Sequence, residues 1–339
     1  MNGSGASRKK RVLAVASGGG HWRQLRRLQP AWSGARVTYA TTIAAYRDEI
    51  ENGAAFAVVP DASRWNKAML LWQATRVLLL VLRSRPQVIV TTGAAPGFWA
   101  VVFGRLLGAR TCWIDSVANA EELSGSGERV GRFARLWVTQ WEHLARPPKL
   151  RFFGNVLGKI PDREAREVTP PGEVRVPETV LVTVGTQLPF DRLLGAIDQW
   201  AQRHPDARVF AQIGPSGVSP EHVETSVFLE PRELDRRIRE ADVVVAHAGV
   251  GTVLSCLMAG TPVVLMPRLA SRREHRNEHQ SATADRFRSI PGVVVADDES
   301  RLEDAIREAM EHGGGRLGEA ADDGLIRAIS EFVSGGSPT

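Results

Sequence analysis

The chain is poor in cysteine and has no long apolar run. Its 339 residues include only two cysteines, Cys112 and Cys256, which lie far apart and form no spacing pattern. Such a low content excludes a disulfide scaffold and a cysteine-rich zinc module, and it is typical of a reducing cytoplasm. Residues 86–104 carry no charge, but glycine and proline interrupt them, so we expect no membrane-spanning helix. The apolar stretch at residues 12–17 is too short for a secretory signal.

Two motifs typical of nucleotide-dependent enzymes are also missing. The glycine-rich turn at residues 17–22 does not continue as Gly-x-Gly-x-x-Gly, and no acidic residue ends the next apolar run, which argues against a nicotinamide dehydrogenase. No Asp-x-Asp occurs, so a metal-clamped diphosphate has no evident ligands. His275 and His279 are four residues apart, but they lack the His-Glu-x-x-His order and an evident third ligand. We therefore predict no metal site and no cofactor.

The net charge of +5 hides a difference between the two halves of the chain. Residues 1–150 contain 21 Lys+Arg against 9 Asp+Glu, whereas residues 151–339 contain 22 against 29. Eight of the nine tryptophans also lie in the first half. A basic, tryptophan-rich half indicates an anionic membrane surface or nucleic acid as a partner. Because only the overall basic balance points to nucleic acid, we expect a membrane surface and no nucleic-acid partner.

Short runs rich in Val and Ile alternate with helix-length segments along the whole chain. This alternation predicts an α/β protein with parallel, doubly wound sheets. Four prolines between residues 158 and 178 indicate a linker. We predict two Rossmann-like domains at 1–157 and 179–333, joined by a linker at 158–178 and followed by a disordered tail at 334–339. The expected strands are residues 12–16, 36–41, 55–59, 87–91, 110–114, 136–139, 179–184, 207–213, 226–229, 242–246, 262–266 and 292–296.

A glycine-rich turn, Ser17 to Trp22, follows the first expected strand. Glycines between a strand and a helix let the backbone approach a ligand, and the N-terminus of the helix attracts an anion. His21 is a candidate general base at neutral pH. The turn fits a purely structural role equally well, with His21 as a helix cap. Together with the junction after residue 91, it forms the predicted acceptor and phosphate loop, whose residues are Gly18, Gly19, Gly20, Gly93 and Pro96.

Three turns in the second half combine glycine with polar residues at the ends of expected strands. The first lies at residues 185–187, and the second, at 246–252, leads into a helix whose N-terminus suits a diphosphate. The third, after residue 266, is rich in arginine and amide side chains. Each turn alone also fits a structural role in any α/β domain. The predicted donor-binding residues are Gly185, Thr186, Gln187, His247, Gly249, Val250, Gly251, Thr252, Arg268, Arg276, Asn277, Glu278 and Gln280.

These motifs resemble those of family 28 glycosyltransferases, which include MurG and the two-subunit N-acetylglucosaminyltransferase of the dolichol pathway. The second half is similar to the donor domain at Val182–Thr186, Ala246–Thr252 and Gly260–Pro262. The first half is similar to the acceptor-side subunit at Ser17–His21, Trp113–Ser116 and Val138–Trp141. The chain therefore looks like both subunits fused over roughly residues 10–290. Its glycine-rich turn and arginine-rich loop most resemble the bacterial exopolysaccharide pair PssD and PssE.

The resemblance implies a GT-B fold, with the two Rossmann-like domains facing a cleft, and inverting, metal-independent transfer from a UDP-sugar co-substrate. Through PssD and PssE it implies β-1,4-glucuronosyl transfer from UDP-glucuronate to a polyprenyl-diphosphate-linked saccharide in exopolysaccharide biosynthesis. His21 is then the base at the acceptor hydroxyl, and Asp115, which ends a strand, is its rival. The helix after Gly249 would stabilise the departing UDP. The carboxylate of glucuronate needs a guanidinium, and the candidates for a bidentate pair are Arg268, Arg272, Arg273 and Arg276.

Residues 66–82 combine apolar side chains with Lys67 and Arg76, a pattern that fits an interfacial membrane face or a buried core. We expect a cytoplasmic protein, peripheral on the inner face of the plasma membrane, with a UDP-sugar donor and a lipid-linked saccharide acceptor as partners. Three alternatives stay open: an N-acetylglucosaminyltransferase that uses UDP-N-acetylglucosamine, a UDP-sugar 2-epimerase, and a non-catalytic UDP-sugar-binding subunit.

Overall fold

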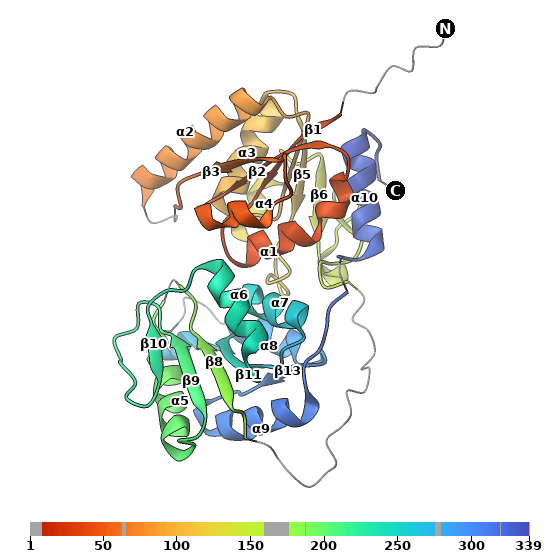
Figure 1. Ribbon diagram of the computed structural model, residues 1–339. Coiled ribbons are helices and arrows are strands. Elements are labelled where there is room, and N and C mark those ends of the chain that lie inside the picture. Colours follow the sequence, from red (N-terminus) through yellow and green to blue (C-terminus); the bar gives the residue numbers. More distant parts are fainter. Residues whose placement is uncertain are drawn as a thin grey trace. The chain divides into compact units, whose positions relative to one another are not determined.

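A computed structural model describes residues 9–62, 66–158, 176–186, 188–274, 279–318 and 320–338, without the side chain of residue 279. The chain divides into two compact units (Figure 1). Unit 1 consists of Met1–Gly158 together with Ala320–Thr339, and unit 2 consists of Lys159–Glu319. Each unit is built around one parallel sheet.

Unit 1 has a seven-stranded sheet in the order β3-β2-β1-β4-β5-β6-β7, and all neighbours pair in parallel. The strands are β1 (Arg11–Val15), β2 (Arg36–Thr41), β3 (Ala55–Val58), β4 (Val88–Thr91), β5 (Arg110–Ile114), β6 (Leu136–Thr139) and β7 (Leu150–Phe152). The helices are α1 (Gly20–Arg27), α2 (Lys67–Ser84), α3 (Ala94–Leu106), α4 (Gly125–Val130) and α10 (Asp323–Ser334), with 3-10 turns η1 (Gln29–Trp32), η2 (Ala44–Glu49) and η3 (Glu142–Leu144).

Unit 2 has a six-stranded parallel sheet in the order β10-β9-β8-β11-β12-β13. The strands are β8 (Thr179–Thr183), β9 (Arg208–Gln212), β10 (Glu224–Ser226), β11 (Val243–His247), β12 (Val263–Met266) and β13 (Val293–Val295). The helices are α5 (Asp191–Arg203), α6 (Pro231–Glu240), α7 (Val250–Ala259), α8 (His279–Phe287) and α9 (Leu302–His312), with 3-10 turns η4 (Ala270–Arg272) and η5 (Glu299–Arg301).

The strand order reverses once in each sheet, between β1 and β4 in unit 1 and between β8 and β11 in unit 2. At such a point the loops after the two central strands turn to opposite faces of the sheet, and a crevice opens beyond their carboxyl ends. The central strands are rich in Val, Leu and Ile and almost fully buried, as expected for a parallel sheet covered on both faces. The fold therefore places the four turns after β1, β4, β8 and β11 where α/β proteins bind ligands.

The helices fix these sheets by burying one face each. In unit 1, Val77 and Val81 of α2 and Ala100 of α3 pack with Leu13 and Ile89 of the sheet. The opposite face of α2 stays exposed, although it is largely apolar. No helix among the residues that the structure describes is both long enough and apolar enough to span a bilayer.

The predicted fold class, α/β with two doubly wound Rossmann-like domains, is confirmed, and strands are present in all twelve expected regions. Two details differ. The expected strand at 226–229 forms instead as β10 at Glu224–Ser226, because the apolar residues that suggested it, Val227 and Phe228, are exposed at the sheet edge. The short edge strand β7, at Leu150–Phe152 and one residue after the Pro147-Pro148 pair, was not predicted.

The C-terminal end differs most from prediction. We expected residues 179–333 in the second domain and a disordered tail, but Ala320–Thr339 belongs to unit 1 (Figure 1, where blue α10 lies beside elements of the first sheet). The apolar face of α10 is buried there, and the Arg110 guanidinium stacks on Phe332 at 4.4 Å. Arg110 also donates to the carbonyls of Gly335 and Gly336, which orders the tail. Most of the predicted linker, residues 159–175, lies outside the described residues.

Candidate functional site

The glycine-rich turn after β1 is braced by the segment that follows the neighbouring strand β2. Gly18 N–H donates to the Thr42 hydroxyl (3.0 Å) and Gly19 N–H to the Tyr46 hydroxyl (3.0 Å). Gly19 has a φ of +66°, which favours glycine. The predicted anion-binding amides of Gly18 and Gly19 are therefore occupied by the turn itself. The N–H groups without a helical partner at this point belong to Gly20 and the rest of the first turn of α1.

His21 lies in that first turn, and its imidazole points across the switch point of the sheet. Its Nδ1 is 2.7 Å from the carbonyl oxygen of Thr92, the residue that follows β4. Because a carbonyl can only accept, Nδ1 carries the proton and Nε2 keeps the lone pair. Burial is the main cause that lowers the pKa of His21 below 6.5, against the raising effects of the Thr92 hydrogen bond and the Asp115 charge. The ring is thus neutral at pH 7, with Nε2 as its basic atom.

Gly93 lies next to the His21 ring and leaves it space because glycine has no side chain. Its φ is +116°, its N–H donates to the Thr91 hydroxyl (3.0 Å), and a Cβ at this position would lie 3.1 Å from His21 Cε1. The next residue, Ala94, has a φ of +61°, a strained value for a residue with a side chain. Pro96 is buried in the first turn of α3, where proline costs no hydrogen bond. The predicted Gly93 therefore acts on His21 directly.

Asp115, the rival candidate for the base, is 2% exposed and surrounded by donors. Its carboxylate accepts from Trp113 Nε1 (3.2 Å), Asn119 Nδ2 (3.2 Å), and both the N–H (2.8 Å) and the hydroxyl (2.6 Å) of Ser124. These bonds hold the loop that leads into α4. The geometry favours a structural and electrostatic role for Asp115, and the assignment of the base stays a prediction.

Unit 2 repeats the arrangement of a histidine ring against a glycine at its own switch point. His247, the last residue of β11, has Nδ1 3.4 Å from the Thr183 carbonyl of β8. Gly185 has a φ of +78°, its N–H donates to the Thr183 hydroxyl (3.3 Å), and a Cβ there would lie 2.8 Å from His247 Cε1. A Cβ on Gly249 would lie 2.3 Å from His247 Nε2. The predicted residues Gly185 and Gly249 therefore both lie against the ring of His247.

Helix α7 begins directly after Gly249. The N–H groups of Thr252 and Val253 both donate to the Gly249 carbonyl (3.1 and 3.2 Å), so the predicted Thr252 amide is occupied. The N–H groups of Val250 and Gly251 open the helix and are the ones directed at the carboxyl edge of the sheet. Two amides at a helix N-terminus, next to a small turn at Gly185 and Thr186, form an arrangement suited to an anion.

Arg268, which the sequence predicts as a carboxylate ligand, forms hydrogen bonds to backbone carbonyls of unit 2. It is 3% exposed, and one guanidinium nitrogen donates to the carbonyls of Val184 (2.6 Å) and Leu188 (2.5 Å), which flank residues 185–187. The predicted Gln280 likewise uses its side-chain oxygen to accept from Arg268 N–H (3.1 Å). Burial lowers the pKa of Arg268 to about 10, so it stays charged at pH 7. Arg268 therefore holds the turn between Val184 and Leu188.

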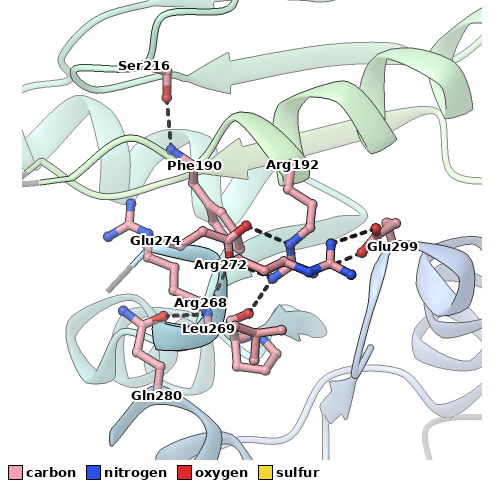
Figure 2. A network of polar contacts seen from close by, with 10 residues as sticks. Phe190, Arg192, Ser216, Arg268, Leu269, Arg272, Glu274, Gln280 and Glu299 are labelled. Carbon is pink, nitrogen blue, oxygen red and sulfur yellow. Dashed lines mark hydrogen bonds and ion pairs between the residues drawn. The ribbon is translucent and has the colours of Figure 1, made fainter. Parts of the chain in front are cut away.

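The loop after β12 is held by an ion-pair network (Figure 2). Arg192 of α5 binds both oxygens of Glu274 (2.7 and 2.8 Å), one oxygen of Glu299 (3.1 Å) and the Pro267 carbonyl (2.8 Å). Arg272 pairs with the other oxygen of Glu299 (2.8 Å). Glu274 also accepts from Leu269 N–H (3.0 Å). The network fixes the backbone of residues 267–274, and Arg272 takes part in it through its ion pair with Glu299.

Four predicted donor-binding residues, Gln187, Arg276, Asn277 and Glu278, lie outside the described residues, so their roles stay predictions. Within the described ranges, no three His, Cys, Asp or Glu side chains are grouped as a metal site. Sequence reasoning missed Thr92, Glu274 and Arg192. For Thr92 a signal existed: a polar residue following an apolar strand at the ligand edge. For the ion pair of Arg192 with Glu274 no signal existed, since the two residues are 82 positions apart.

Comparison with known proteins relates the chain to glycosyltransferases. Residues 179–321 match the model of the glycosyltransferase family 28 C-terminal domain, which confirms the resemblance expected for the second half. The chain is 28% identical over 188 residues to the UDP-N-acetylglucosamine transferase subunit ALG14 of Eremothecium gossypii, covering 46% of this chain and 84% of that protein. A specific similarity to PssD and PssE was not found among these relatives and stays a prediction.

Solved structures share the fold over nearly the whole chain. MurG from Acinetobacter baumannii is 15% identical, with a TM-score of 0.55 and coverage of 96% of this chain and 99% of that one. A putative UDP-N-acetylglucosamine 2-epimerase from Listeria monocytogenes is 10% identical, with a TM-score of 0.58 and coverage of 98% of both chains. At such identities the likeness shows the fold alone, and it supports the predicted GT-B type.

Proposed function

We propose that this protein is an inverting, metal-independent glycosyltransferase that moves a sugar from a UDP-sugar to a lipid-linked saccharide. The observation that carries the proposal is the state of His21: Nδ1 is bonded to the Thr92 carbonyl, so the basic Nε2 is available in a neutral ring. The family 28 match of residues 179–321 supplies the reaction class.

The acceptor side of the reaction falls to unit 1. Nε2 of His21 takes the proton of the acceptor hydroxyl as its oxygen attacks the anomeric carbon. The bond from that carbon to the UDP oxygen breaks, and the configuration inverts. The N-terminus of α1, where His21 lies, offers positive potential to a diphosphate on the acceptor.

The donor side falls to unit 2. The UDP that leaves carries an additional negative charge, which the Val250 and Gly251 N–H groups at the start of α7 would stabilise. Fixed dipoles of this kind need no metal ion. We expect activity in EDTA to equal activity with magnesium; activity that disappears in EDTA and returns with magnesium would contradict this mechanism.

Two donors compete, and we favour UDP-N-acetylglucosamine. The printed name of the Eremothecium gossypii relative supports it. UDP-glucuronate, expected from the sequence, needs a guanidinium for its carboxylate, but Arg268 is bonded to two carbonyls and Arg272 to Glu299. Glucuronate therefore stays the second candidate, supported by Arg273, which is exposed in the same loop. A role in exopolysaccharide biosynthesis stays a prediction.

The membrane proposal is supported by the outer face of α2. Leu71 is 70% exposed and Trp72 51%, and the Arg76 guanidinium lies 5.6 Å from the Trp72 ring. No acidic residue occurs in α2. An exposed apolar helix face with cations and without anions fits an anionic bilayer surface, in keeping with a peripheral protein on the inner face of the plasma membrane.

Vesicle sedimentation tests this surface. We expect binding to vesicles rich in phosphatidylglycerol, weaker binding to neutral vesicles, and loss of binding in L71E/W72E. V227E alters a residue that is 65% exposed in unit 2 and serves as the control. Equal binding by all three proteins would remove α2 from the proposal.

A donor screen and a transfer assay test the function itself. A ligand that binds only the folded state raises its stability, so UDP, UDP-N-acetylglucosamine, UDP-glucuronate and UDP-glucose are compared by thermal shift. Transfer to a polyprenyl-diphosphate saccharide should fall ~100-fold or more in His21→Ala, with little change in donor binding. Donor consumption without acceptor would indicate a 2-epimerase, and donor binding without any turnover would indicate a non-catalytic subunit.

A further inference from the structure

We propose that Thr92 is a positioning residue that fixes both the tautomer and the orientation of His21. The inference rests on the proposed function for its catalytic meaning, because His21 is the base there. Thr92 is fully buried and follows β4, directly across the switch point from the turn that carries His21.

Thr92 holds His21 by two separate hydrogen bonds that run in opposite directions. Its carbonyl oxygen accepts from His21 Nδ1 at 2.7 Å, and its hydroxyl donates to the His21 carbonyl oxygen, also at 2.7 Å. The first bond fixes the ring, and the second fixes the backbone from which the ring projects. Together they leave one arrangement of the imidazole, with Nε2 directed away from Thr92.

Three further residues surround the His21 ring. Gly93 lies against the His21 ring: a Cβ added at Gly93 would be 3.1 Å from His21 Cε1 and 3.5 Å from the Trp113 ring. Asp115 is the charged group whose field reaches His21. None of these neighbours bonds Nδ1 in place of the Thr92 carbonyl, so the tautomer depends on where that carbonyl lies. That carbonyl is held from two sides: the Gly93 N–H of the same peptide group donates to the Thr91 hydroxyl (3.0 Å), and the Thr92 hydroxyl donates to the His21 carbonyl (2.7 Å).

Thr92→Val removes the hydroxyl and keeps the shape of the side chain. The His21 carbonyl still lies within α1, where it can accept the usual helical N–H. Thr111→Val is the matched control, because Thr111 is also fully buried and its hydroxyl also donates to a backbone carbonyl, that of Phe133, at 2.7 Å. Thr111 lies at the amino end of strand β5, whereas His21 lies beyond the carboxyl end of the parallel strand β1. The Thr111 hydroxyl also accepts from the Arg135 N–H (3.3 Å), so Thr111→Val should lose at least as much stability as Thr92→Val.

We expect Thr92→Val to lower kcat by roughly 10- to 100-fold, since small displacements of a catalytic group have effects of this size. KM for the UDP-sugar should stay unchanged. Thr92→Ser, which restores the hydroxyl, should recover most of kcat, and Thr111→Val should leave it unchanged.

Nitrogen NMR of histidine-labelled protein gives a readout that does not depend on turnover. The His21 signals, identified by their loss in His21→Ala, should show protonated Nδ1 alone in the native protein and a mixture of tautomers in Thr92→Val. A native tautomer in Thr92→Val, together with a kcat equal to that of Thr111→Val, would overturn the proposal. If the NMR result is as expected but His21→Ala still transfers sugar, the positioning role stands and the proposed catalytic function fails.

Discussion

Arg268 offers the sharpest test of how the donor side is built. Arg268→Met keeps most of the side-chain volume but removes the guanidinium that bonds the Val184 and Leu188 carbonyls. Hydrogen bonds to charged groups contribute about 1.5–3 kcal/mol each, and the cost of burying the cation offsets part of this. We expect a net loss of about 2–4 kcal/mol, which for a unit of this size corresponds to a fall in Tm of about 4–16 °C.

The functional effect should be the same for every donor. Because Arg268 acts through the backbone of residues 184–188, Arg268→Met should raise KM for UDP-N-acetylglucosamine and UDP-glucuronate by equal factors. Arg272→Met is the control: Arg272 is half-exposed and forms one ion pair, so its loss should cost about 0.2–1 kcal/mol. Calorimetry and initial rates with both donors give the comparison. A normal Tm with weakened binding of UDP-glucuronate alone would refute this reasoning and restore Arg268 as a carboxylate ligand.

Two further predictions concern the ring of His21. Gly93→Ala should lower kcat by ~10-fold or more, because its new Cβ meets the ring and its φ of +116° disfavours a side chain; Gly108→Ala, at a φ of +84° with no atom within 4 Å, should cost stability only. The acid limb of kcat/KM should have its midpoint below pH 6.5, because burial lowers the pKa of His21 and the neutral ring is the active form. A midpoint above 6.5, or equal kcat in both alanine variants, would contradict the proposed base.

The sequence predicts the fold well where burial is continuous. Apolar runs such as residues 243–246 are typical of central strands when turns and helices flank them, and this one forms part of β11 in the sheet. The errors are at edges. The run at Val227 and Phe228 is apolar but exposed, and β10 pairs with one neighbour only, so composition does not fix its bounds. The assignment of α10 to unit 1 depends on which surface its apolar face meets, which no local pattern contains.

The site shows the same division between local and distant information. The turns after β1, β4, β8 and β11 are visible in the sequence because glycine and polar residues interrupt buried strands. What each residue does there is set by partners far away in the chain. Gly18 and Gly19 bind Thr42 and Tyr46 rather than a ligand, and Arg268 binds backbone 80 and 84 residues away. Residue type and spacing therefore locate the site, but they do not separate the residues that face a substrate from those that support them.

Asp115 is the residue for which this distinction decides the mechanism. Its carboxylate accepts from four donors, so Asp115→Asn places an amide donor against Ser124 or Trp113 and should destabilise unit 1 by about 1–3 kcal/mol. The field of Asp115 raises the pKa of His21, so removing its charge lowers that pKa further. The acid limb of kcat/KM should then move to lower pH, while transfer at neutral pH persists within ~10-fold.

If Asp115 were the base, transfer in Asp115→Asn would instead fall ~100-fold or more at every pH, and His21 would be left as a structural residue. Rates measured from pH 5 to 9 in both single variants and in native protein distinguish these outcomes, provided that each protein is shown to be folded at the assay temperature.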